Sequence, residues 1–267
     1  MSSIVRPTPS QMTRRLFVLA AAIFAVVIAQ AQMLLGWGQS PAEFAADSDA
    51  TLRVAGYAFS IWGVIYLGLL VYAVRQVLPQ TGESDLIRRL GWPSVAALLG
   101  IGLWIVASAG DWEIGTIVLI FGSLLVLLIP LLLNAHTIRA LGRGDRDRWM
   151  TVWPLALLAG WLTIASPVNL LTVATGNGDL PAVLPPLGWA LVAVAAVVVV
   201  ALLVTWRLRL TAYSIPIAWG LLGVFVAEQE RNAALGFSAL AAALMVLGGA
   251  LVIVFQLRPG VERRVER

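Results

Sequence analysis

Three side chains in one apolar segment are spaced so that they could bind a flat ring. Trp161, Ala165 and Asn169 recur at every fourth residue. An α-helix has about 3.6 residues per turn, so each step of four moves only about 40° around its surface. The three side chains therefore share one helix face. A large ring, a small residue and an amide in that order form a slot with a hydrogen-bonding end rather than a filled core.

A second aromatic pair has the same spacing. Trp62 and Tyr66 are four residues apart, and Phe59 precedes them by one turn. Trp104 is a further Trp far from the end of an apolar segment. The alternative to a binding slot is ordinary packing, in which each buried indole N–H finds a local partner. The binding hypothesis requires Trp62 and Trp161 to face each other across a gap.

The residue types that are missing exclude several kinds of chemistry. The chain has no Cys and no Lys, which excludes disulfides, thiolate nucleophiles, a retinal Schiff base and a Walker-type phosphate loop. The single His136 cannot build a multi-histidine metal site and could serve only as a lone haem ligand, so we expect no metal site. No carboxylate lies deep in an apolar segment, where acid–base catalysis or ion coupling would need one. The sequence favours a binding protein over an enzyme and leaves enzymatic activity open.

These residues lie in a chain dominated by apolar segments. Hydrophobic residues make up 60% of it and the mean hydropathy is +0.90, which excludes an ordinary soluble domain. A helix needs about 20 residues to cross a hydrocarbon core of about 30 Å. We therefore expect an all-α membrane protein with about eight transmembrane helices. The predicted spans are 14–36, 54–77, 92–110, 114–135, 150–174, 186–206, 212–227 and 233–257, of which the seventh is the shortest.

The charges predict how the chain is threaded. All 18 basic residues are Arg, and 16 of them fall in connections on one side of the predicted spans, with only Arg53 and Arg231 on the other. That other side holds eight of the 14 carboxylates. This is the positive-inside pattern. We expect a multi-pass protein of a bacterial plasma membrane with both termini cytoplasmic, and inner Arg side chains that face anionic lipid headgroups. No nucleic-acid partner is expected.

The two ends of the chain each leave an alternative open. Arg14 and Arg15 precede an apolar run that could be a cleaved signal peptide, although the run is long enough to favour a retained helix. Near the C-terminus, Gly248 and Gly249 and the Ala-rich run 239–243 allow close helix contacts. Those contacts could be internal or could form a homodimer.

Two of the motifs resemble a known family. Trp161, Ala165 and Asn169 are similar to the fifth-helix signature of the tryptophan-rich sensory protein family, also called the translocator protein or TspO/MBR family. The segment 59–66, with its Phe, Trp and Tyr, resembles the second-helix motif of that family, and Trp104 resembles its third-helix Trp. The resemblance covers about residues 14–175.

Some positions depart from the family pattern. The Pro-rich, Trp-containing stretch between the first two helices is replaced by 38–51, which has one Pro and several acids. Ile101 stands where the family has an Asn, and Leu157 stands where it has a Pro. We therefore predict an enlarged member with a cytoplasmic tail (1–13), a TspO-like five-helix bundle (14–175), three additional transmembrane helices (176–257) and a basic cytoplasmic tail (258–267).

The resemblance implies a membrane receptor or sensor whose pocket lies between the helices and binds a planar apolar ligand of the tetrapyrrole class, porphyrin or haem. The pocket-lining residues that it implies are Trp62, Tyr66, Trp161, Ala165 and Asn169, with Phe59 and Trp104 as additional candidates. Arg53 could pair with a propionate of the ligand, or with Asp47 or Asp49 instead. The alternatives are a transporter of small apolar metabolites and a protein that modifies a bound porphyrin in a light- or oxygen-dependent reaction.

Overall fold

The computed structural model describes residues 7–46 and 52–256. In this part of the chain there are helices and no strand, and eight of the helical segments are long and apolar enough to cross a membrane. Their bounds are Pro9–Leu35 (α1), Gly56–Val77 (η1 and α3), Asp85–Ala109 (α4), Glu113–Leu133 (α5), Arg148–Gly176 (η2 and α7), Pro186–Leu208 (α8), Thr211–Glu228 (α9) and Ala233–Phe255 (α10 and part of η3). The predicted fold class and number of spans are confirmed, while the predicted tails lie wholly or partly outside the described residues.

Capping residues explain where the helices extend beyond the apolar runs. α1 begins at Pro9 because Thr8 forms a reciprocal capping box with Gln11. α4 begins at Asp85, seven residues before the predicted start, because the Ser84 side chain accepts from the backbone N–H of Ile87. Polar residues in these first turns obscured the true helix starts in the hydropathy pattern.

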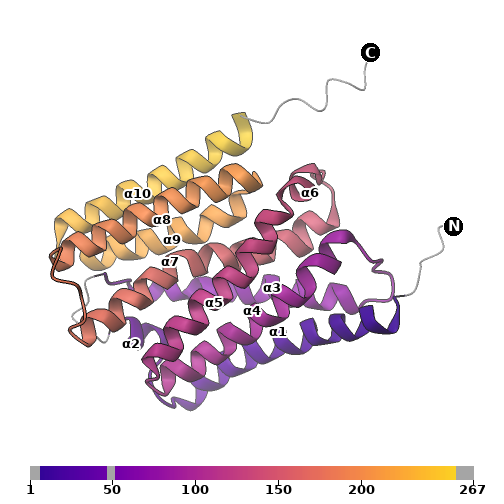
Figure 1. Cartoon of the computed structure of the whole chain (residues 1–267), viewed down its shortest axis with the longest axis horizontal. Coiled ribbons are helices and arrows are strands. Elements are labelled where there is room, and N and C mark those ends of the chain that lie inside the picture. Colours follow the sequence, from indigo (N-terminus) through magenta and orange to yellow (C-terminus); the bar gives the residue numbers. More distant parts are fainter. Residues whose placement is uncertain (1–6, 47–51, 257–267) are drawn as a thin grey trace.

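Five of the long helices form a closed ring (Figure 1). α3 (Ile61–Val77) contacts α1, α1 contacts α4, α4 contacts α5, α5 contacts α7 (Trp153–Gly176), and α7 returns to α3. A short helix, α2 (Pro41–Ala46), follows α1 and packs on α4 and α7. The ring is the predicted five-helix bundle, and α2 covers one of its ends.

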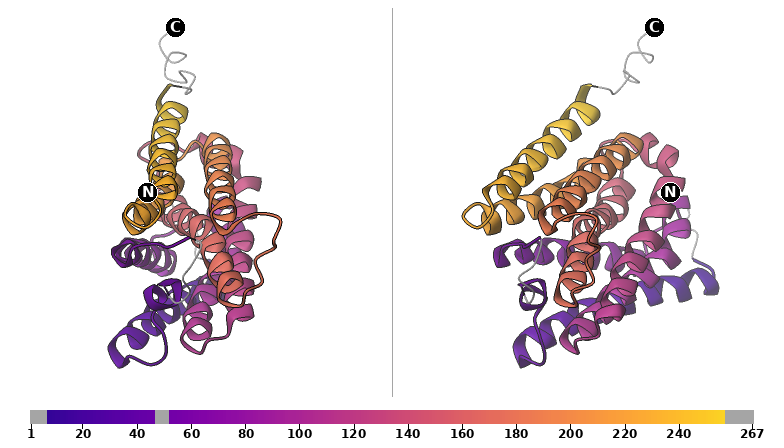
Figure 2. Two further views of the ribbon diagram at one scale, coloured as in Figure 1. Left: turned by 90° about the vertical axis from the view of Figure 1, so that its left-hand side faces the viewer. Right: turned by 60° about the vertical axis from the view of Figure 1, so that its left-hand side comes forward.

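The last three long helices pack together and join the ring mainly through α7, with smaller contacts from α8 to α5 and from α9 to η1. α8 contacts both α9 and α10, and α9 packs along α7 (Figure 2). α7 and α9 can approach closely because Gly160 has no side chain. A Cβ atom added there would lie 2.1 Å from the backbone oxygen of Tyr213. A Cβ on Gly249 would likewise lie 2.5 Å from the Leu202 side chain of α8. The Gly-rich C-terminal region therefore makes an internal close contact.

We call the two ends of the bundle the arginine end and the loop end. The arginine end holds the start of α1 and the connections α3–α4, α5–α7 and α8–α9. The loop end holds the connections α1–α3, α4–α5, α7–α8 and α9–α10, and α2 lies there (Figure 1).

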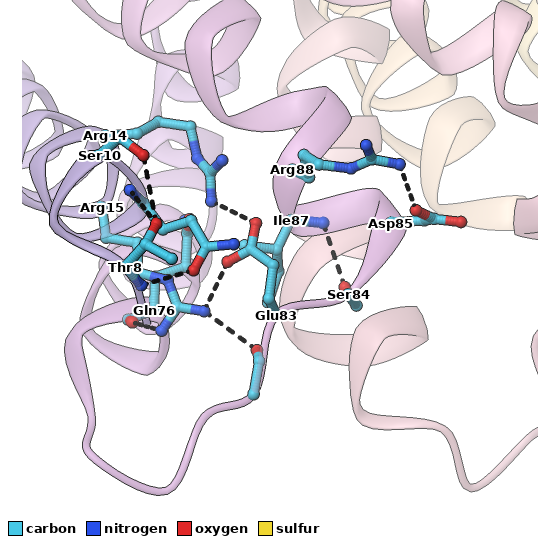
Figure 3. A network of polar contacts seen from close by, with 12 residues as sticks. Thr8, Ser10, Arg14, Arg15, Gln76, Glu83, Ser84, Asp85, Ile87 and Arg88 are labelled. Atoms are coloured by element: carbon cyan, nitrogen blue, oxygen red, sulfur yellow. Dashed lines mark hydrogen bonds and ion pairs between the residues drawn. The ribbon is translucent and has the colours of Figure 1, made fainter. Parts of the chain in front are cut away.

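Two arginines at the arginine end are buried rather than directed at lipid (Figure 3). Arg14 and Arg15 are 6% and 1% exposed, and they donate to the two carboxylate oxygens of Glu83 at 2.6 and 2.7 Å. Arg15 also donates to three backbone carbonyl groups, those of Gln76, Thr81 and Gly82. The expectation that the inner Arg side chains face lipid headgroups is wrong for this pair, because the α3–α4 connection folds over both guanidinium groups.

Candidate functional site

A cavity lies at the loop end of the bundle, beneath α2. It encloses about 670 Å³, open space at its mouth included. Its walls come from α2, η1, α3, α4, α5, α7 and α9. The lining residues are Pro41, Phe44, Ala45, Val54, Phe59, Trp62, Ile101, Trp104, Ile120, Trp161, Leu162, Ile164, Ala165, Val168, Asn169, Thr172 and Gly220.

α7 supplies more of this lining than any other helix. Trp161, Ala165 and Asn169 all line the cavity, together with Val168 and Thr172. These positions lie on one face of the helix because they recur at intervals of three and four residues. The structure thus places the predicted α7 face against open space.

The indoles of α3 and α7 touch each other on the cavity wall. Trp62 and Trp161 meet edge to face, with ring centroids 6.2 Å apart and planes at 78°. Phe59 meets Trp161 in the same way at 6.0 Å. The expectation of two indoles facing each other across a gap is wrong, because this edge contact is a favourable aromatic geometry. The form of the binding hypothesis that requires a gap between these two rings therefore fails. Both rings still line an open space, which lies beside them, and a binding proposal can rest only on that space.

Tyr66 does not line the cavity. Its ring stacks on Trp62 with centroids 5.0 Å apart and planes at 26°, and the residue is buried. The four-residue spacing correctly predicted that Trp62 and Tyr66 share a face. Tyr66 supports the ring of Trp62 from behind and holds its orientation.

Asn169 is already engaged by two protein partners. Its Oδ1 accepts from the indole Nε1–H of Trp104 at 2.9 Å, and its Nδ2 donates to Thr116 Oγ1 at 2.9 Å. The expected role of this amide as a ligand hydrogen bond therefore needs correction, since its oxygen fixes Trp104 and its nitrogen binds α5. Trp104 is consequently oriented by a buried polar partner, and Phe44 of α2 packs edge to face against its ring at 5.9 Å.

The hydroxyl group of Thr172 is different from the other hydroxyl groups of α7. Thr163, Ser166 and Thr175 each donate to the carbonyl oxygen four residues earlier, at 2.8, 2.7 and 2.6 Å. Thr172 lines the cavity, is 4% exposed, and its Oγ1 has no hydrogen-bond partner. Because an unsatisfied buried hydroxyl is costly, it marks a place where a ligand could bond.

α2 forms a wall of the site that was not predicted from the sequence. Ser40 and Glu43 cap this short helix reciprocally, since each backbone N–H donates to the other side chain. The backbone hydrogen bond from Ser40 lowers the pKa of the exposed Glu43 carboxyl group. The Ser-x-x-Glu spacing, followed by Phe and two Ala residues, was the signal that could have revealed the helix. Its packing on the bundle mouth had no local signature.

α9 also contributes to the cavity wall, which was not predicted from the sequence either. Gly220 lines the cavity, and a Cβ atom there would lie 3.0 Å from Ile164 and 3.5 Å from the Trp161 ring. The Trp219 indole donates to the backbone oxygen of Ala58 at 2.9 Å, and the N–H of Ala55 donates to the carbonyl of Gly223 at 3.0 Å. One of the three C-terminal helices, α9, therefore forms part of the site, contrary to a reading in which only the first five helices form it.

Arg53 does not line the cavity. Its backbone N–H donates to Glu228 Oε1 at 3.1 Å, and Glu228 is buried at the end of α9. The alternative partners Asp47 and Asp49 lie outside the described residues. Because Arg53 is not among the lining residues, its predicted contact with a ligand anion is not supported.

The arrangement suits binding better than proton transfer. No side chain that lines the cavity is charged or contains an imidazole or phenol. Within the described residues, no three His, Asp or Glu side chains gather where they could hold a metal ion. What the site offers is three indoles, two phenyl rings, small residues that leave space, and one unpaired hydroxyl group.

Comparison with known proteins identifies the family to which this chain belongs. A family model described as TSPO-like protein matches residues 14–254, while no curated protein and no solved structure matches the chain. The match covers nearly all of the described helices, including those that the motif resemblance over 14–175 left out. With its eight apolar helices, the chain is a multi-pass membrane protein, and it belongs to the TSPO-like protein family.

Proposed function

We propose that the protein is a membrane receptor or sensor that binds a planar apolar ligand of the tetrapyrrole class in the loop-end cavity. The single observation that carries this proposal is an aromatic-lined space that the protein's own side chains leave open. Well-packed interiors contain few voids larger than a water molecule, and small-molecule sites typically measure about 300–1,000 Å³ with mostly apolar walls. The cavity is larger than such a void, and its lining is almost entirely apolar and aromatic, as this description requires.

The identity of the walls supports a flat ligand. Trp62, Trp104 and Trp161 come from three different helices, and each ring is held by another contact of its own. Rings fixed in this way lose little conformational entropy when a ligand packs on them. Ala165 and Gly220 keep the space beside the Trp161 ring open. The absence of a charged lining residue favours a receptor over an ion-coupled carrier or an acid–base enzyme.

The binding proposal is tested by titrating the purified protein in lipid nanodiscs with protoporphyrin, read from the absorption band of the ligand. Trp161→Leu and Trp62→Leu are each expected to weaken binding about tenfold, because each removes a stacking surface. Trp206→Leu is the matched control, since Trp206 is 53% exposed on α8 and lies outside the lining. Unchanged affinity in both cavity variants would remove the assignment of the site.

For the orientation, the proposal is that both termini face the cytoplasm across a bacterial plasma membrane. The distribution of Arg supports it, because 16 of the 18 lie in the sequence segments assigned to the arginine end or next to them. The chain has no Cys, so single-Cys variants can be labelled cleanly in whole cells. Val183→Cys, in the α7–α8 connection, should react with an impermeant maleimide, and Gly142→Cys, before η2, only after permeabilisation. The reverse pattern would contradict this orientation.

A further inference from the structure

The lining of the cavity holds almost no polar group that is free to bind. Indoles aside, Asn169 and Thr172 are the polar side chains of the lining. The Asn169 side-chain oxygen accepts a hydrogen bond from the Trp104 indole, and its nitrogen donates one to Thr116. Thr172 Oγ1 is left as a buried hydroxyl group without a partner. A ligand in this cavity therefore meets the Thr172 hydroxyl group, the indole N–H groups of Trp62 and Trp161, and no cation.

The loop end around the cavity is acidic. The segments assigned to it hold eight carboxylates and only Arg53 and Arg231. Arg231 contacts Glu228 at 3.4 Å, and the backbone of Arg53 bonds to the same carboxylate; both arginines are engaged in further contacts. The stretch 47–51, between α2 and Leu52, contains two Asp and no basic residue. An anionic ligand that approaches this end meets a field of its own sign.

The lack of a cation in the lining and the acidic loop end both disfavour an anionic ligand. A carboxylate moved into an apolar cavity loses its hydration, and that loss is offset only where a cation or several donors receive it. The lining offers no cation, and its free donors are neutral: the Thr172 hydroxyl group and the indole N–H groups of Trp62 and Trp161. An ester or an unsubstituted ring edge loses far less on entry, and the hydroxyl group of Thr172 can donate to an ester carbonyl or accept from a ring N–H.

We infer that the cavity selects an uncharged planar ligand with one hydrogen-bonding group directed at Thr172. For a tetrapyrrole, this means a form with esterified or missing carboxylates in preference to the dicarboxylate. The inference rests on the proposed function, since it specifies which members of the ligand class the same site accepts. It makes Thr172 a specificity-determining residue, although neither its type nor its spacing singled it out in the sequence.

The test compares protoporphyrin with its dimethyl ester, which has the same ring and no carboxylate. Both are titrated into the protein in nanodiscs of zwitterionic lipid, and empty nanodiscs give the correction for partition into lipid. The ester is expected to bind at least about tenfold more tightly than the diacid after that correction. Val54→Arg places a cation on the lining and is expected to shift the preference back toward the diacid.

A matched pair of variants tests the role of Thr172. Thr172→Val keeps the shape of the side chain and removes the unpaired hydroxyl group, so we expect about a fivefold to tenfold loss of affinity for the ester. Thr175→Val is the control on the same helix, because the Thr175 hydroxyl already donates to Leu171. Its affinity for the ester is expected to equal that of the unsubstituted protein.

The outcomes separate this inference from the proposed function. If the diacid binds as tightly as the ester or more tightly, or if Thr172→Val leaves the ester affinity unchanged, the inference is overturned while a tetrapyrrole receptor still stands. If neither compound binds beyond its partition into lipid, the proposed function itself fails. Preference for the ester together with its loss in Thr172→Val supports both.

Discussion

The two ends of the bundle treat buried polar groups in opposite ways. At the arginine end, Arg15 is 1% exposed and bonds to Glu83 and three backbone carbonyl groups, so that α1 is fixed to the α3–α4 connection. At the loop end, Thr172 is nearly as buried, yet its hydroxyl group is unpaired beside an unfilled aromatic space. A buried group that makes an ion pair and several hydrogen bonds holds a fold together even where one of its atoms, such as Arg15 Nε, is unpaired. A buried hydroxyl group with no partner beside an open aromatic space is typical of a binding site.

The largest expected effect concerns the arginine end. Arg15→Leu leaves Glu83 and three carbonyl groups short of a donor, and breaking a buried ion pair in this way typically costs about 3–5 kcal/mol. We expect a large drop in the thermal midpoint of the detergent-solubilised protein. Arg88→Ala is the control, because the Arg88–Asp85 pair is more than half exposed and is expected to contribute about 0–1 kcal/mol. Equal midpoints for the two variants would show that the arginine end is not the more tightly held region.

The contact between α7 and α9 should also be sensitive. A Cβ atom in Gly160→Ala would lie 2.1 Å from a backbone oxygen of α9, so the helices must separate, at an expected cost of about 1–3 kcal/mol. Since α9 also forms part of the cavity wall, protoporphyrin affinity should fall with the thermal midpoint. Gly122→Ala on α5 has no atom within 4 Å of its Cβ and should leave the protein as stable or slightly more stable. A Gly160→Ala protein with unchanged binding would separate α9 from the site.

Two substitutions at the loop end sharpen the contrast between paired and unpaired groups. Asn169→Ala leaves the Trp104 indole N–H without its partner and removes the hydrogen bond that the Thr116 hydroxyl accepts, although that hydroxyl still donates to Glu113. Stability should therefore fall by about 1–3 kcal/mol. Thr172→Val removes a hydroxyl group that bonds to nothing in the protein and should leave the thermal midpoint of the ligand-free protein unchanged or raised. A comparable loss of stability in both variants would mean that Thr172 is paired in solution and does not await a ligand.

The smallest expected effect is at α2. The hydrogen bonds from Ser40 lower the pKa of Glu43 in the folded protein, so the capping interaction stabilises α2 above the unfolded pKa of Glu, about 4.3. That contribution is lost as the pH falls through the lowered folded value. The protection of the α2 amides, measured as the exchange rate relative to that of an unstructured peptide at the same pH, should therefore fall at acidic pH, and Glu43→Gln should remove most of this pH dependence. Protection of α2 that does not change with pH in the unsubstituted protein would contradict the capping role.

Much of the architecture could be predicted from periodic patterns. The apolar runs predicted all eight long helices, because a membrane-spanning helix must satisfy its own backbone hydrogen bonds and present apolar side chains over about 20 residues. The repeat of Trp161, Ala165 and Asn169 predicted their shared face, because helical geometry alone decides it. The helix starts at Pro9 and Asp85 were missed, since capping depends on single side chains rather than on hydropathy.

What the tertiary structure decided is which groups meet across long sequence separations. The sequence determined that an indole, an amide and several hydroxyl groups lie along α7, but only packing pairs Asn169 with Trp104 and leaves Thr172 unpaired. Packing likewise places Phe44 and Gly220 on the cavity wall and buries Arg15 beside Glu83. Local periodicity fixes the direction of a side chain from its own helix axis. Its partner depends on how helices far apart in the chain approach each other, and no local pattern records that.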